Sequence, residues 1–345
     1  MRIRSAIIPI LVISTCGISC ERAFLDEPAT DPVALFVELW STFEEQYAPF
    51  EERGVDWGEQ YRTFRPLVSP STSEDELFDI MGRMLAVLND GHVSLTAPGR
   101  EIFFSNYIRR EQIEDELFNL EVIRENYLEP GYESDEMPSY LYGKIRNHDI
   151  GYIFFDHVGE NLYQMNRFLE AYGDMDGFIM DFRHNQGGDF TYCYSVMGRL
   201  TDRERYVFKS KTKNGPGVDD YTDWMEWYIT PEGSYIGKTI VVLADRYTIS
   251  AGERSVMAFM ILPNVTLLGD TTSGAHGTMI GRELANGWFF SLVPQKVVLF
   301  AGNSYEGICL IPDLYFKNEP DEVASGIDST LLTAVSLISP GLDRK

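Results

Sequence analysis

The stretch KTIVVLAD (residues 238–245), followed two residues later by TISAGERS (residues 248–255), decides how this chain folds. An apolar run of this length is typical of a buried strand, and the residues after Ser250 have the pattern of a helix. Ser250 and Glu253 have the spacing of a capping box, in which the two side chains satisfy each other's backbone donors. The same serine would also stand where a strand gives way to a helix, beside the first helix amides. Ser250 is therefore either a helix cap or a nucleophile.

This strand is one of several that alternate with helical patterns in the second half of the chain. The apolar segments are IGYIFFDHV (150–158), DGFIMDFR (176–183), KTIVVLAD (238–245), NVTLLGD (264–270) and GWFFSLVPQKVVLF (287–300). Strands separated by helices predict crossover connections and a sheet covered by helices on at least one face. The sequence therefore predicts an α/β fold class for this half.

The first part of the chain has a helical pattern instead. Apolar residues recur every three or four positions in residues 31–47, and residues 71–90 begin with serine, threonine and acidic side chains that favour a helix start. We divide the chain into a signal peptide (1–19), a linker (20–30), a small N-terminal helical domain (31–95), a connecting segment of strands and loops (96–144) and the α/β domain (145–345).

Composition and charge exclude some classes of function. The chain has 345 residues, 44% of them hydrophobic, which is enough for a large core. Its 53 acidic and 29 basic residues give a formal net charge of −24. Nucleic-acid binding requires clustered basic residues, so no nucleic-acid partner is expected.

The N-terminus has the pattern of an export signal. Two arginines precede an apolar run too short to span a bilayer, and small residues lead to Cys20 in GISCE. Cys20 resembles the lipidated cysteine of bacterial lipoproteins, whereas Cys16 fits less well because a threonine precedes it. We expect an exported protein of the cell envelope, tethered to a membrane by acyl chains.

Two further cysteines, Cys193 and Cys309, lie among apolar or aromatic residues. Two buried free thiols and one disulfide both fit this pattern. No CxxC pair or histidine cluster indicates a metal site, so no metal is expected.

A glycine-containing segment, DFRHNQGGD (residues 181–189), follows one of the predicted strands. The paired Gly187 and Gly188 allow backbone amides to approach a ligand closely, as an oxyanion hole requires. The alternative is a tight turn with left-handed residues. Asp181 and Arg183 are expected to have structural roles.

A histidine follows the predicted helix in LNDGHVSL (residues 88–95). His92 is a candidate base for a serine, because an imidazole titrates near neutral pH. If this segment is extended, His92 and Ser94 lie on one face. A surface histidine without a catalytic role is the alternative, and His184 and His276 are rival bases.

A glutamate near the end of the predicted sheet, Glu306, is a candidate for orienting the base through Ser94 or a water molecule. The alternative is a solvated glutamate in a loop.

Taken together, these motifs resemble the carboxyl-terminal processing peptidase family. The shared features are a DxRxNxGG strand end, an SAxE helix start about sixty residues later, an upstream DGH and a downstream ExxxxxPD. The family includes tail-specific proteases, the tricorn protease core and a retinoid-binding protein of the photoreceptor matrix. The resemblance covers roughly residues 35–340 and implies a crotonase-like β/α spiral core beside a helical domain. It also implies serine peptidase activity without a cofactor, with Ser250 as nucleophile and Ala251, Gly187 and Gly188 as oxyanion-hole donors.

Two branches of this family activate the serine differently. A lysine is the base in the tail-specific branch, and Ala275 occupies the matching position here. The tricorn-like branch uses a histidine with a serine and a glutamate behind it, and His92 and Glu306 match these. The bridging serine is expected immediately before the histidine, where this chain has Gly91, so Ser94 is the candidate substitute.

The sequence thus predicts a serine peptidase that acts on a peptide or protein substrate. A non-catalytic carrier of an apolar ligand or peptide on the same scaffold is the alternative, since 13% of the residues are aromatic and could line such a pocket.

Overall fold

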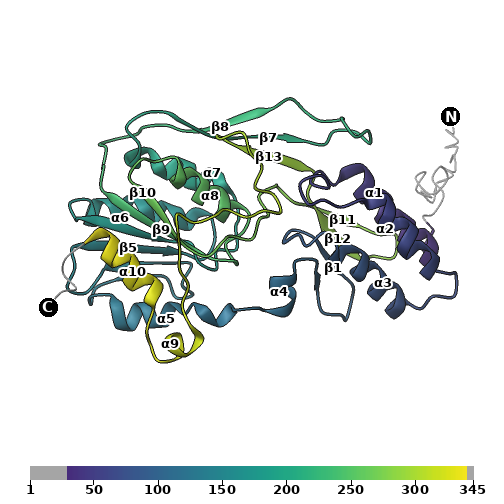
Figure 1. Ribbon diagram of the computed structural model, residues 1–345, viewed down its shortest axis with the longest axis horizontal. Helices are drawn as coiled ribbons and strands as arrows, with labels where there is room; N and C mark the ends of the chain where they lie inside the picture. The colour runs from purple at the N-terminus through teal and green to yellow at the C-terminus, as the bar shows by residue number, and fades with distance from the viewer. Residues whose placement is uncertain (1–28, 340–345) are drawn as a thin grey trace, which may run out of the picture.

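The computed structural model describes residues 29–339, in which an N-terminal part with helices and a small sheet adjoins a larger α/β part (Figure 1). The predicted signal peptide and Cys20 lie outside the described residues.

The N-terminal helices begin at the caps that the sequence provides. The helices are α1 (Pro32–Gln46), α2 (Trp57–Phe64) and α3 (Glu74–Ala86), with a 3₁₀ turn η2 (Arg65–Leu67) after α2. Asp31 and Asp56 accept backbone N–H groups at the starts of α1 and α2, and Ser73 and Glu76 form a capping box on α3. The predicted helical pattern of this region is therefore confirmed.

These helices pack on a four-stranded sheet that combines distant parts of the chain. Its order is β11 (Ile280–Glu283), β12 (Phe289–Leu292), β1 (Ser94–Thr96) and β2 (Phe103–Phe104). One buried apolar cluster includes Phe36 and Phe43 from α1, Met84 from α3 and Phe290 from β12. The β11–β12 hairpin is thus part of the same core as helices almost 200 residues earlier in the sequence.

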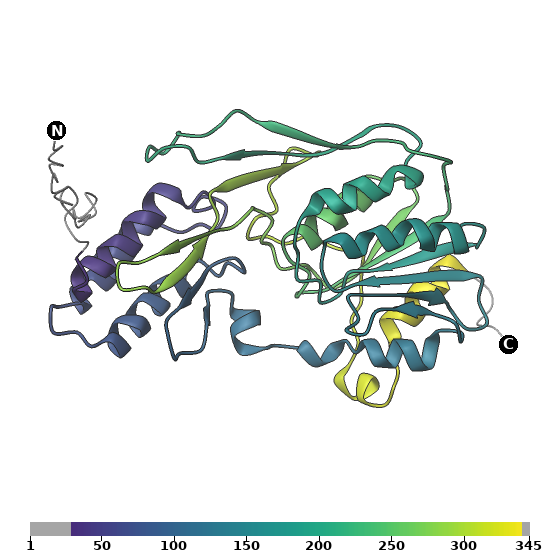
Figure 2. The same cartoon turned by 180° about the vertical axis from the view of Figure 1, so that it is seen from behind.

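The connecting segment crosses from this part to the α/β part (Figure 2). After β2 it contains α4 (Tyr107–Glu111), η3 (Asp115–Leu117), α5 (Leu120–Val122), η4 (Ile123–Tyr127), β3 (Glu133–Ser134) and β4 (Tyr140–Lys144). Short helices therefore lie between the strands in a region for which strands and loops were predicted.

A seven-stranded sheet forms the centre of the α/β part. Its order is β14 (Leu314–Tyr315), β10 (Val265–Gly269), β9 (Thr239–Ala244), β6 (Gly177–Asp181), β5 (Ile150–Phe155), β4 (Tyr140–Lys144) and β3. The five strands from β14 to β5 are parallel to one another. β4 is antiparallel to β5, and β3 is antiparallel to β4. The predicted alternation of strands and helices is confirmed as a mixed α/β fold.

Helices cover both faces of this sheet (Figure 1). The helices of the α/β part are η5 (Glu160–Tyr163), α6 (Gln164–Tyr172), α7 (Phe190–Val196), η6 (Met197–Leu200), α8 (Ala251–Met260), α9 (Pro320–Ala324) and α10 (Ser329–Ile338). Alternate strand residues face opposite sides: Ile153 packs in the cluster with α6, α7 and α8, whereas Tyr152 packs in the cluster with α10. Since both faces are buried, the central strands β5, β6 and β9 are almost entirely apolar.

A third sheet extends from the α/β part over the N-terminal part (Figures 1 and 2). Its order is β13 (Gln295–Leu299), β7 (Arg205–Thr212) and β8 (Met225–Ile229). Since β13 follows the β11–β12 hairpin after a two-residue connection, the chain passes directly between the two parts here.

A buried ion network fixes the end of β6. Arg183 pairs with Asp181 at 2.6 Å and with Asp328 at 2.9 Å, and all three side chains are buried. Asp181 and Arg183 thus have the structural roles predicted for them. The two cysteines, Cys193 and Cys309, are free, so the disulfide alternative is wrong.

Candidate active site

Ser250 occupies the turn between β9 and α8 in a strained conformation. Its φ of 60° and ψ of −123° lie in a region that non-glycine residues rarely adopt, and such strain concentrates at functional sites. The Ser250 N–H donates to the carbonyl of Ala275 at 3.0 Å and to Glu253 Oε2 at 3.3 Å. Glu253 therefore supplies the glutamate half of the predicted capping box, while Ser250 also lines a pocket.

The paired glycines lie directly against Ser250. Gly187 and Gly188 have φ values of 79° and 141°, and a Cβ atom on Gly187 would lie 2.6 Å from the Ser250 Cβ. A Cβ atom on Gly188 would lie 2.1 Å from the Val158 carbonyl oxygen. Both positions therefore require glycine, for backbone conformation and for space.

Only one of the two glycine amides is available to a ligand. The Gly187 N–H donates to Asn185 Oδ1 at 3.0 Å. Among residues 29–339 no acceptor is found for the Gly188 N–H, and Ala251 opens α8, where the first N–H groups have no partner within the helix. The amides of Gly188 and Ala251 are therefore left free to donate to a ligand.

His92 lies beside this turn although it is distant in sequence. The chain packs so closely here that a Cβ atom on Gly91 would lie 2.5 Å from Ile249 Cδ1. Backbone bonds hold the histidine: its N–H donates to Asp90 Oδ1 at 2.8 Å, and its carbonyl accepts the Ser291 hydroxyl at 2.7 Å. His92 is thus fixed against the residue that precedes Ser250.

Burial determines the protonation state of His92. Loss of solvent lowers the pKa of the imidazole to about 4, against the opposing charges of Asp90 and Glu253. The ring is therefore neutral at neutral pH, as a base must be. Its Nδ1 is buried without a hydrogen-bond partner among the described residues.

One pocket of about 580 Å³ joins these groups. His92, Ser250, Ala251, Gly187 and Gly188 all line it. A candidate nucleophile, a candidate base and two free amides therefore face the same space, although they come from three distant parts of the sequence.

Ser94 and Glu306 do not complete the predicted relay by direct contact. Ser94 also lines the pocket, but its hydroxyl pairs with the Ser291 hydroxyl at 2.8 Å. The Glu306 carboxylate pairs with Arg53 at 2.7 Å and accepts the N–H groups of His276 and Gly277 at 2.9 and 3.1 Å. Both side chains thus have partners other than the His92 ring.

The rival histidines have structural partners and do not line this pocket. His184 Nε2 lies 3.3 Å from Asp245 Oδ2. His276 is buried with Nδ1 3.4 Å from Glu253 Oε1; burial lowers the pKa of its imidazole, but Glu253 more than offsets this and the net shift is upward. Of these three histidines, His92 is the one that lines the pocket together with Ser250.

Two protein-family models match this chain. The model of peptidase family S41 matches residues 149–316, and the model of the tricorn protease C1 domain matches residues 28–86. The segment of residues 149–316 belongs to peptidase family S41. The S41 match contains the glycine turn, Ser250 and Glu306, whereas His92 lies between the two matched segments.

One sequence relative with a known name agrees with this assignment. The carboxy-terminal processing protease CtpA of Bacillus subtilis is 26% identical over 160 residues, which are 45% of this chain and 32% of that protein. The match therefore spans about a third of that relative's length.

Solved structures extend the likeness to most of the chain. A protein of Parabacteroides merdae described as a candidate peptidase has 26% identity and a TM-score of 0.81, over 90% of this chain and 98% of that one. Mature CPAF bound to lactacystin has a TM-score of 0.69 at 11% identity, over 90% and 99% of the two chains, and so shows the fold alone.

Three residues in or beside this site were not identified from the sequence. Arg53 joins Asp90 and Glu306, Ser273 places a hydroxyl beside Gly91, and Arg254 lines the pocket. Arg254 alone was recognisable in principle, since it lies four residues after Ser250 on the same helix and so on the same face.

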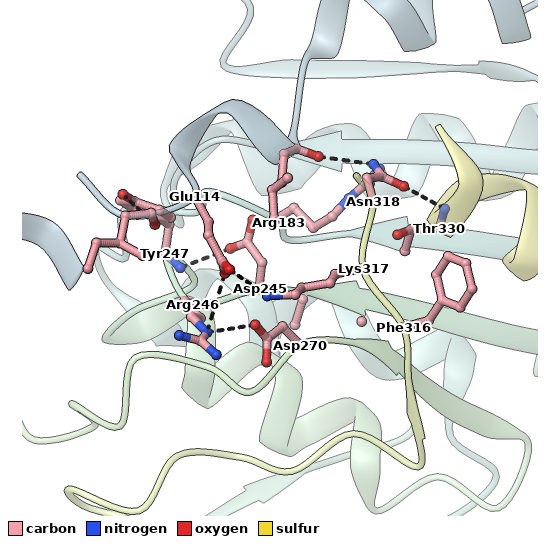
Figure 3. A pocket seen from close by; sticks show the side chains of 14 residues that line it. Glu114, Arg183, Asp245, Arg246, Tyr247, Asp270, Phe316, Lys317, Asn318 and Thr330 are labelled. Atoms are coloured by element: carbon pink, nitrogen blue, oxygen red, sulfur yellow. Dashed lines mark hydrogen bonds and ion pairs between the residues drawn. The ribbon is translucent and has the colours of Figure 1, made fainter. Parts of the chain in front are cut away.

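A second pocket lies at the carboxyl ends of β9 and β10 and is lined by charged side chains (Figure 3). Glu114 pairs with Lys317 at 2.6 Å, and Arg246 pairs with Asp270 at 2.7 Å. Its volume of about 30 Å³ suits a single water molecule. Since its charges neutralise one another, this pocket does not present a free charged group to a ligand.

Proposed function

We propose that this chain hydrolyses peptide bonds, with Ser250 as the nucleophile and His92 as the general base. The observation that carries the proposal is the shared pocket, which Ser250 and His92 line together with Gly188 and Ala251. The S41 membership supports the same reaction class, and we extend it to a crotonase-like classification of the α/β core.

In the proposed reaction, Ser250 Oγ attacks the substrate carbonyl carbon while His92 takes the hydroxyl proton. We assign this proton transfer to the Nε2 atom of His92, because its Nδ1 atom is buried. The amides of Gly188 and Ala251, with the positive end of the α8 dipole, stabilise the oxyanion. The C–N bond then breaks, and His92 returns the proton to the leaving amine. Water hydrolyses the acyl-enzyme by the same steps, which restores the serine.

Covalent labelling tests this proposal. A fluorophosphonate is expected to phosphonylate the purified protein at Ser250, as mapped by mass spectrometry. The Ser250→Ala variant should not be labelled, whereas His148→Ala should be labelled like the unaltered protein. A folded protein that resists the reagent at every pH would instead support the carrier alternative.

The pH dependence of labelling reports the base. Because burial lowers the pKa of His92 to about 4, the neutral imidazole is expected to persist well below the ordinary value of 6.5. The labelling rate should be flat between about pH 5 and 7 and fall about tenfold per unit below pH 4. Circular dichroism at each pH separates this loss from unfolding, and an acidic limb near pH 6.5 would contradict the prediction.

We further propose that Ser273 holds the His92 ring. The Ser273 hydroxyl is buried without a partner among the described residues, as is His92 Nδ1. It lies 2.9 Å from the position that a Cβ atom on Gly91 would occupy. A hydroxyl from a distant loop thus lies next to the position that the side chain of a serine immediately before the histidine would occupy. A hydrogen bond donated by Nδ1–H to the Ser273 hydroxyl oxygen would fix the tautomer in which Nε2 is free to accept a proton.

The variant Ser273→Ala is expected to lower kcat about 10- to 100-fold with little change in KM, because one hydrogen bond that positions the base is lost. Ser94→Ala should stay within about twofold, since Ser94 is paired with Ser291. Steady-state kinetics on one peptide substrate measures both. A larger kcat loss in Ser94→Ala would restore Ser94 as the bridging residue.

We also propose that Cys20 is lipidated and that the protein is tethered to the cell envelope, as the N-terminal sequence predicts. Within residues 29–339, each helix is too short or too polar to cross a bilayer. Metabolic incorporation of labelled palmitate that persists in Cys20→Ala would contradict the anchor.

A further inference from the structure

Arg254 is a buried cation beside the proposed nucleophile. It lies one turn after Ser250 on α8, lines the same pocket and is only 3% exposed. Its Nε donates to the His276 carbonyl at 2.7 Å, and its Nη2 donates to the Gln295 side chain. Both acceptors are uncharged, so these bonds leave the positive charge without a counter-ion.

Two other buried arginines of this chain are each paired with carboxylates, unlike Arg254. Arg183 pairs with Asp181 and Asp328, and Arg53 pairs with Asp90 and Glu306. In the described part of the chain, by contrast, no carboxylate lies within 4 Å of Arg254. Instead, the rings of Phe190 and Phe208 lie 4.7 and 5.0 Å from its guanidinium carbon.

The nearest carboxylates act on Arg254 only at longer range and are engaged by other groups. Burial lowers the pKa of Arg254 to about 10, and Glu306, Glu253 and Asp189 oppose this shift. Glu253 accepts the amides of Gly274 and Ala275, and Asp189 caps α7. These carboxylates favour the charged form of the guanidinium but do not form an ion pair with it.

A second cation, Arg109, faces the same pocket. It donates to Gln186 Oε1 at 3.0 Å and lies over the Phe104 ring, with no carboxylate pair among residues 29–339. The pocket lining contains these two arginines and no aspartate or glutamate, although the chain as a whole carries a net charge of −24. The pocket is therefore a positive site in an acidic protein.

We propose that the substrate carries a carboxylate that binds Arg254, with Arg109 contributing to its attraction. This inference rests on the proposed peptidase function and names the class of peptide that the site selects. A planar guanidinium binds a carboxylate through two parallel hydrogen bonds, and these are strong where water is excluded. Both an acidic side chain and a free C-terminal carboxylate present this group.

A library of synthetic decapeptides with randomised positions tests the proposal. The library is prepared twice, once with a C-terminal acid and once with a C-terminal amide. Cleavage by the full chain is read by mass spectrometry. We expect peptides with a carboxylate at one fixed position to be cleaved at least about tenfold faster than their amide isosteres. Preference for Asp and Glu over Asn and Gln identifies a side chain, whereas preference for acid over amide ends identifies the C-terminus.

The Arg254→Gln variant should reduce this preference to near one, and Arg282→Gln should retain it, because Arg282 is exposed and binds Gln46 outside the pocket. If Arg254→Gln does not fold, Arg109→Gln should still lower the preference several-fold. Equal cleavage of acids and amides by an enzyme that fluorophosphonate labels would overturn this inference alone. An unaltered chain that neither labels nor cleaves would overturn the proposed function instead.

Discussion

Alanine at Ser250 is expected to lower kcat/KM by roughly 10⁴- to 10⁶-fold, and alanine at His92 by a similar factor. The double variant should lose no more than either single variant, because the two side chains act as one unit: the base is of use only while the hydroxyl is present. Peptide hydrolysis by the three variants, compared as a double-mutant cycle, measures this coupling.

Matched controls separate this result from a loss of folding. Ser195→Ala removes a hydroxyl that bonds the Tyr192 carbonyl on α7, and His148→Ala removes an imidazole from a turn. Neither residue lines the pocket, so both variants should retain activity. Losses at Ser250 and His92 that simply multiply in the double variant would show that the two residues act independently.

The strand and helix pattern around Ser250 was predictable because it is local. A parallel strand buried on both faces must be apolar along its whole length, as Thr239–Ala244 is apart from its first residue. The helix after it begins with the serine and glutamate spacing of a capping box, of which the Glu253 half is formed. The position of the candidate nucleophile at this junction therefore followed from the sequence alone.

The partners that the Ser94 and Glu306 side chains bind are set by tertiary packing, which the spacing of residues in the sequence does not show. Ser94 pairs in register with Ser291, which is 197 positions away, and that pairing occupies its hydroxyl. Glu306 meets Arg53 across 253 positions. The sequence places both residues near the site but does not identify their partners.

The oxyanion donors show the same limit at shorter range. The pair Gly187 and Gly188 indicated an amide turn, and the close approach to Ser250 agrees with it. The Gly187 N–H is nevertheless used by the side chain two residues before it. Asparagine bonds of this kind are common in turns, so a sequence alone does not decide which amide is left free.

Gly91 explains why a serine is missing before His92. A Cβ atom there would lie 2.5 Å from Ile249 Cδ1 and 2.9 Å from Ser273 Oγ, so a serine would fit only if both of these side chains moved. The hydroxyl of Ser273 fills the adjacent space from another loop. A sequence comparison that reads one position at a time records only the missing serine.

Methionine at Arg53 is expected to lower the free energy of unfolding by about 3–5 kcal/mol, because it leaves Asp90 and Glu306 buried without their counter-ion. In the present structure Arg53 lies 3.3 Å from Asp90 and 2.7 Å from Glu306, and all three side chains are almost fully buried. Urea denaturation of both proteins measures the difference. The control Arg62→Met should cost less than about 1 kcal/mol, since Arg62 and Asp56 are 69% and 64% exposed.

The sign of the pH dependence distinguishes this electrostatic cause from lost packing. Burial already raises the pKa of Glu306 above 4.5 in the folded protein, and removing Arg53, which lowers it, would raise it further. A folded pKa above the unfolded one penalises folding fully above the folded pKa and not at all below the unfolded pKa. The destabilisation of Arg53→Met should therefore shrink as the pH falls towards about 4.5. If the loss in free energy of unfolding caused by Arg53→Met stayed constant from pH 8 to pH 4.5, the arginine would stabilise the fold by filling space. The charge of Glu306 would then not contribute to the contact between Arg53 in the N-terminal part and Glu306 in the α/β part.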